Sequence, residues 1–118
     1  MVYFSHEFAK QREPAVRFMV AYLKGVRDFY DAFFLNKGKA ETIALLVQHL
    51  PMKDPAMWEP SRQFIDLNGK MNVADLKAQG EYYRQTGVVT GTMADVEKFI
   101  DPSFAAEAVK RLGERKRE

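Results

Sequence analysis

The sequence has no cysteine and only two histidines among its 118 residues. Without cysteine the chain has no disulfide, no thiolate ligand for a metal and no thiol nucleophile. The two histidines, His6 and His49, have no histidine partner at helical spacing, whereas a zinc site needs three or four converging ligands. We therefore expect no metal site and no thiol chemistry in this chain.

Long apolar runs are also missing. The most apolar run, residues 18–23, is six residues long and is flanked by Arg17 and Lys24. A membrane-spanning helix needs about 20 apolar residues, so we expect no membrane span. Residues 1–7 lack the basic start and the apolar core of a secretory signal, so we expect no signal peptide at this start.

Outside the last nine residues, the chain has almost no excess of charge of one sign. The whole chain has a net charge of +2, but residues 110–118 carry +3, which leaves −1 on residues 1–109. The basic excess thus belongs to a tail and does not form the broad basic surface that attracts nucleic acid. We expect no nucleic-acid partner, and we interpret residues 114–118 as a charged, flexible tail.

The length and composition indicate one folded unit. With 118 residues, 47% of them hydrophobic, the chain is long enough for one core and too short for two independent cores. We therefore expect a single helical domain over residues 1–113. Residues 2–4 favour β-structure and end at Ser5, so they predict a short N-terminal strand remnant.

The dominant predicted element is a helix over residues 14–35. Pro14 suits the first helical position, where its missing N–H costs no hydrogen bond, and Asn36 with Gly38 ends the helix. A narrow charged stripe consists of Arg17, Lys24, Asp28 and Asp31. A wide apolar face holds Val16, Met19, Val20, Leu23, Val26, Tyr30 and Phe33. So wide a face implies packing contacts on several sides.

Capping residues and apolar spacing predict shorter helices over residues 6–11, 40–50, 73–86, 93–100 and 102–112. Asp54 and Asp101 each precede a proline, which is typical of a helix start, and the helix after Asp54 has room for only a turn or two. Asn72 and Thr92 are further predicted caps. We expect Leu76, Tyr82 and Tyr83 to be packing residues. The sequence thus predicts a mainly α fold with five or six helices.

No local motif supports catalysis. The two-glycine segment 87–92 has neither the strand before it nor the Lys-Ser or Lys-Thr after it that a phosphate-binding loop needs. The three serines lie at turns or helix starts, where capping explains them. Trp58, Tyr82 and Tyr83 are more typical of core residues than of a ligand-stacking site. We expect no enzyme activity, no catalytic residues and no cofactor.

One resemblance covers nearly the whole chain. Its order and spacing are carried by residues 8–30 (FAKQREPAVRFMVAYLKGVRDFY), 66–72 (DLNGKMN), 79–83 (QGEYY), 101–104 and 108–113. In these segments the chain resembles the C-terminal part of ABC-transporter periplasmic substrate-binding proteins of the nitrate, sulfonate, taurine and thiamine-precursor type.

The resemblance implies a two-lobed receptor with the type II periplasmic-binding-protein α/β fold, which closes on a small solute and delivers it to an ABC permease. Residues 1–113 would be the C-terminal part of the first lobe, with residues 2–4 as the strand that returns from the second lobe. The parent would be periplasmic and non-catalytic. Nearly all positions that contact solute in relatives lie outside this chain, so no ligand-binding residue is assigned.

The apolar face of the 14–35 helix is wider than five short helices cover easily, as expected if a sheet normally lies against it. We therefore predict that the isolated chain forms a homo-oligomer through this face. The alternative is a free-standing helical interaction or oligomerisation module whose basic tail binds an acidic partner.

Overall fold

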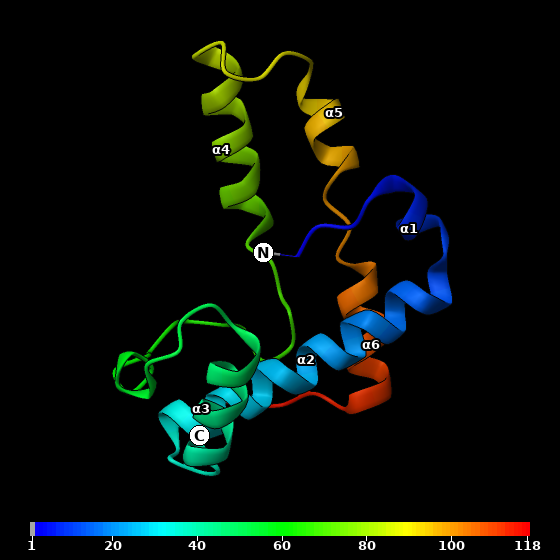
Figure 1. The fold of residues 1–118 in the computed structure, drawn as a ribbon. Helices are drawn as coiled ribbons and strands as arrows, with labels where there is room; N and C mark the ends of the chain where they lie inside the picture. Colours follow the sequence, from blue (N-terminus) through cyan, green and yellow to red (C-terminus); the bar gives the residue numbers. More distant parts are fainter. Residues whose placement is uncertain (1) are drawn as a thin grey trace.

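The computed structural model describes residues 2–118 (Figure 1). In chain order the elements are α1 (His6–Lys10), α2 (Arg12–Phe34), α3 (Lys39–His49), the 3-10 turn η1 (Pro55–Met57), α4 (Val73–Gln85), α5 (Met93–Lys98) and α6 (Ser103–Leu112). No strand occurs within residues 2–118. The prediction of a mainly α chain is confirmed, and the helix ends fall within two residues of the predicted ones.

Residues 2–4 form no strand, so the predicted strand remnant is wrong for this chain. A strand needs a neighbouring strand to complete its hydrogen bonds, and the described part of the chain provides none. Aromatic packing holds this segment instead. The ring of Phe4 lies edge-on to Phe8, Phe18 and Phe104, with centroids 5.1, 5.6 and 5.2 Å away. These contacts are worth about 0.5–1.5 kcal/mol each beyond the area they bury.

α2 is the central element, and its apolar face packs against four neighbours. Its first half packs against α1 and α6, its middle against the loop that contains Leu67, and its last turns against α3. The side chains buried in these contacts are Ala15, Val16, Met19, Leu23, Val26, Tyr30, Ala32, Phe33, Ile43, Leu67, Phe104, Ala105 and Ala108. Most of the apolar face predicted for the long helix is therefore core.

Polar contacts at the rim hold α6 in register along α2. Arg111 of α6 donates two hydrogen bonds of 2.8 Å to the carboxylate of Glu13, and this hydrogen bonding lowers the pKa of Glu13 below its ordinary value. The Arg12 guanidinium lies 4.2 Å from the centroid of the Phe104 ring and donates to the Ser103 hydroxyl at 2.8 Å. These contacts join residues about 90 positions apart in the sequence.

The predicted caps are confirmed. The Asp54 and Asp101 carboxylates each accept a hydrogen bond of 2.9 Å from the backbone N–H two residues ahead. Asn72 caps α4, and Thr92 forms a capping box with Asp95 at the start of α5. Each cap satisfies a backbone donor that the helix itself leaves unpaired, which explains why the sequence locates these helix starts so well.

The arm, residues 73–98, consists of α4 and α5 and projects from the rest of the molecule (Figure 1). The two helices pack against each other and against no other helix of the described chain. The two helices approach closely at Gly80, since a Cβ at this position would lie 2.8 Å from a methyl group of Val96. The glycine that weakens α4 as a helix therefore permits its contact with α5.

Tyr82 and Tyr83 do not pack as predicted. They are 62% and 43% exposed, because the face of α4 that carries them has no neighbouring helix. Leu76 on the same helix is half-buried. The arm thus presents aromatic side chains to solvent.

Candidate functional site

The candidate site is an open, mostly apolar groove along α2, with a volume of about 330 Å³. We call it the α2 groove. One wall is α2 itself, and the other is the loop that follows η1. The lining residues are Ala21, Tyr22, Gly25, Val26, Phe29, Gln63 and Ile65.

Small residues on α2 create the groove. Ala21 and Gly25 are four residues apart and so lie on one face of the helix, one turn above the other. A Cβ built at Gly25 would meet no heavy atom within 4 Å, so no part of the described chain covers this position. Phe18 continues the same face toward the start of α2 and is 48% exposed. The face is therefore open at Gly25, and it is partly covered at Phe18, where the Phe4 ring packs.

Arg27 holds the second wall of the groove in place. Its guanidinium donates to the Leu67 carbonyl at 3.1 Å, to Oδ1 of Asn68 at 3.1 Å and to the Gly113 carbonyl at 2.8 Å. Leu67 itself is 3% exposed and packs against Val26 and Tyr30 of α2. The loop is thus held both by the buried Leu67 side chain and by charge-assisted hydrogen bonds, which are about twice as strong as neutral ones.

The tail, residues 114–118, which we expected to be flexible, lies against α2 and this loop. The guanidinium of Arg115 pairs through two nitrogens with the Asp31 carboxylate, and the hydrogen bonding raises the pKa of Arg115. The guanidinium of Arg117 lies 4.3 Å from the centroid of the Phe64 ring and also donates to the Ile65 carbonyl. These two basic groups are therefore engaged within the chain, which weakens the idea that the tail serves to bind an acidic partner.

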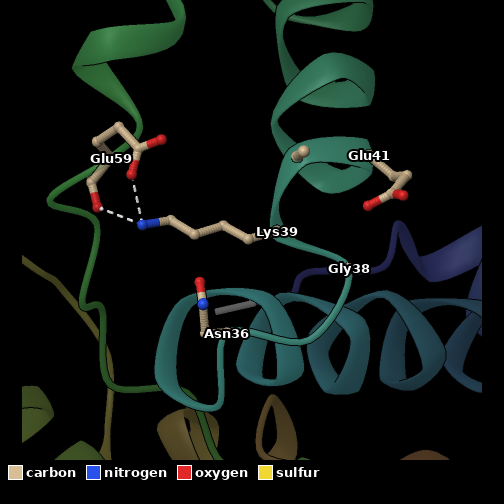
Figure 2. A pocket seen from close by; sticks show the side chains of 6 residues that line it. Asn36, Gly38, Lys39, Glu41 and Glu59 are labelled. Carbon is tan, nitrogen blue, oxygen red and sulfur yellow. Dashed lines mark hydrogen bonds and ion pairs between the residues drawn. The ribbon is translucent and has the colours of Figure 1, made fainter.

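A second, polar pocket of about 490 Å³ lies where α2 turns into α3 (Figure 2). Figure 2 shows Lys39 reaching across to Glu59, with Nζ 2.5 Å from the carboxylate and 3.3 Å from the backbone carbonyl, while Glu41 points away from the pair. The only cation among the lining residues is thus already neutralised, and two carboxylates line the same space. This arrangement does not favour binding of an anion.

The residues considered for chemistry in the sequence are not brought together. Trp58 is half-buried against the α2–α3 contact and donates through its indole N–H to the Met52 carbonyl at 3.3 Å, so its role is packing. His6 and His49 are exposed at the start of α1 and the end of α3. Residues 2–118 contain no cluster of three or more acidic or histidine side chains that is placed to hold a metal ion.

Sequence reasoning missed the second wall of the groove and the tail contacts. The hydrogen bonds from Arg27 to Leu67, Asn68 and Gly113 span 40, 41 and 86 residues, and no local sequence pattern predicts them. The one signal was the turn at residues 66–70, which places the Asn68 side chain where it accepts from Arg27 and from the Arg115 backbone.

No protein-family model matches the chain, and comparison with curated proteins and with solved structures finds no match either. None of the helices described, including the 23-residue α2, is both long and apolar enough to cross a bilayer.

Proposed function

We propose that this chain is a non-catalytic helical scaffold, the C-terminal part of a solute-binding component of an ABC importer. In the parent it would build the first lobe of a periplasmic receptor that passes a small solute to its permease. The single observation that carries the proposal is the α2 groove. The sequence resemblance supplies the identity of the parent.

The groove supports a scaffold role because it is open and mostly apolar and has two small residues at its centre. A helix with apolar side chains over so much of its circumference normally packs on more than one side, as helices do against a sheet. Ala21 and Gly25 leave room at the centre of the groove for side chains from a sheet, and Phe18 and Phe29 flank that room. Other parts of the apolar face of α2 are already covered by α1, α3, α6 and the 63–70 loop.

The isolated chain is not expected to bind solute. A small-molecule site needs polar groups that converge around an enclosed space, and a two-lobed receptor supplies them from both lobes. The polar pocket in this chain has its lysine paired with Glu59. We expect calorimetry with nitrate, alkylsulfonates and pyrimidine thiamine precursors to detect no binding. Micromolar affinity of residues 1–118 for any of these solutes would contradict the proposal.

A direct test of the groove uses an apolar fluorescent dye at sub-micromolar chain concentration. Gly25→Arg places a long charged side chain in open space, so the chain itself tolerates it while the groove is blocked. We expect this variant to lose most of the dye fluorescence. Ala106→Arg adds the same charge at an exposed position of α6 and is the matched control. Equal dye binding by both variants would exclude the groove as the docking face.

The second candidate is a free-standing helical interaction module, and the arm favours it. The arm carries the exposed aromatic side chains Tyr82 and Tyr83, and Phe99, directly after α5, is 88% exposed. In the dye experiment, loss of fluorescence in Phe99→Ser with no loss in Gly25→Arg would favour this module over the scaffold.

A further inference from the structure

The edge of the α2 groove carries opposite charges at its two ends. Arg17, Lys24 and Asp28 are spaced by seven and four residues, which places them on one side of the helix, next to the face formed by Ala21 and Gly25. All three charged side chains are exposed. None of them takes part in an ion pair with another residue of 2–118. Arg17 lies toward the start of α2, Lys24 near its middle and Asp28 toward its end.

The charges at the two ends of this edge, Arg17 and Asp28, are complementary to those of a second copy when the two helices run antiparallel. At 1.5 Å per residue, Arg17 and Asp28 are about 16 Å apart along the axis. A twofold axis between Tyr22 and Gly25 brings Arg17 of one copy next to Asp28 of the other, and the same pair forms again at the opposite end. A parallel twofold arrangement would instead place the charged edges of the two helices on opposite sides of the contact, so Arg17 and Asp28 would not pair.

The shape of the groove has the same symmetry as its charges. The small residues Ala21 and Gly25 lie at the centre, where two helix backbones approach most closely, and a Cβ at Gly25 would have no neighbour within 4 Å. Phe18 and Phe29 lie at the two ends, so each phenyl ring of one copy faces a phenyl ring of the other. A twofold contact requires one surface patch that is complementary to itself, and this patch meets that requirement.

We propose that two copies of this chain associate antiparallel through their α2 grooves, with Ala21 and Gly25 at the twofold axis and Arg17 paired with Asp28 of the second copy. The inference rests on the proposed role of the groove as a docking face. It states that a second copy covers the groove when the chain is isolated. Charged pairs at such an edge set orientation and partner choice more than they set raw affinity.

The test is a charge-reversal cycle read by analytical ultracentrifugation over a micromolar dilution series. We expect the unaltered chain to dimerise, and Arg17→Glu or Asp28→Lys to weaken the dimer by about tenfold or more, because each places like charges opposite one another twice. The double variant Arg17→Glu/Asp28→Lys recreates the pairs in reverse and is expected to restore the dimer. Lys116→Glu, an exposed tail position, is the charge-matched control and is expected to have no effect.

A monomer throughout the series overturns the inference, and so does a dimer that the single reversals leave unchanged or that the double variant fails to restore. A second measurement tests the orientation. Because the chain has no cysteine, Ala21→Cys and Gly25→Cys each introduce a unique thiol. Antiparallel packing predicts that a mixture of the two variants forms disulfide-linked heterodimers faster than either variant alone, and faster homodimers of Ala21→Cys would contradict it.

The two proposals fail in different ways. If the chain is monomeric and its groove binds the dye, only the proposed dimer is wrong, and the scaffold role is unaffected. Micromolar binding of solute by the chain contradicts the scaffold role whatever its oligomeric state.

Discussion

At Gly69 the backbone φ is 67°, in the left-handed region, and a Cβ would lie 3.2 Å from both the Ala105 Cβ and a methyl group of Leu23. Gly69→Ala therefore adds conformational strain of about 1–2 kcal/mol and overpacking of about 1 kcal/mol. We expect urea unfolding to show a loss of about 2–3 kcal/mol in the free energy of unfolding. The turn that carries Gly69 belongs to the same loop as the second wall of the groove.

Two other glycines are the controls for this prediction. Gly87 also has a left-handed φ, of 74°, but no atom within 4 Å of the missing Cβ, so Gly87→Ala is expected to cost only the strain, about 1–2 kcal/mol. Gly25 is helical and open, so Gly25→Ala is expected to stabilise by about 0.5–1 kcal/mol. Equal losses at positions 69 and 87 would contradict the packing contribution at Gly69.

Among the elements, the arm offers a case in which helix propensity and packing predict opposite results. Propensity alone predicts that Gly80→Ala stabilises α4 by about 1 kcal/mol. The missing Cβ would lie 2.8 Å from Val96, however, so we expect the variant to push α5 away and to speed amide hydrogen exchange in residues 73–98. Gly80→Ala/Val96→Ala removes the clash and is expected to restore protection. Slower exchange in the single variant would contradict the close packing.

The same helix provides a prediction for pH. Hydrogen bonds from Arg84 and then Gln85 lower the pKa of the Glu81 carboxyl from 4.5 to about 2. A carboxyl with a lowered pKa in the folded arm adds stability above pH 4.5 and loses that contribution as the pH falls toward 2. We expect an NMR titration to give a Glu81 pKa near 2, and Arg84→Ala to move it toward 4.5. An unchanged titration midpoint in that variant would contradict the assignment to Arg84.

The elements also show what the sequence can predict. Asn72, Thr92 and Asp101 cap the helices they were expected to cap, because a cap is a contact over two or three residues. The burial of Tyr82 and Tyr83 was predicted wrongly, because it depends on whether another element faces α4, and spacing within α4 carries no information on that.

For the molecule as a whole, the fold is closed by contacts that join distant parts of the chain. The core face of α2 was predictable, because the spacing of its apolar residues is a local pattern. For the groove, the sequence predicted only that the helix has more apolar surface than the short helices cover. Its second wall depends on Arg27, Asn68 and Arg115, which are brought together from three separate segments. Nothing in the charged tail itself indicates that it completes this network.

That network makes the tail a structural part of the chain, which leads to a prediction at the scale of the whole molecule. The Asp31 and Arg115 side chains are 25% and 27% exposed and form a two-point contact, so we expect Arg115→Ala to lower the free energy of unfolding by about 1–2 kcal/mol. The Asn68 bonds to the Arg115 backbone remain possible in this variant, which limits the loss.

Lys116→Ala removes an exposed neighbouring charge and is the matched control, with an expected change within about 0.5 kcal/mol. Because the tail also holds the Ile65 carbonyl through Arg117, hydrogen exchange in residues 63–70 is expected to rise in Arg115→Ala and to stay unchanged in Lys116→Ala. If both variants unfold at the same urea concentration and residues 63–70 exchange alike, the tail is a solvated end and the groove wall is held by Leu67 and Arg27 alone.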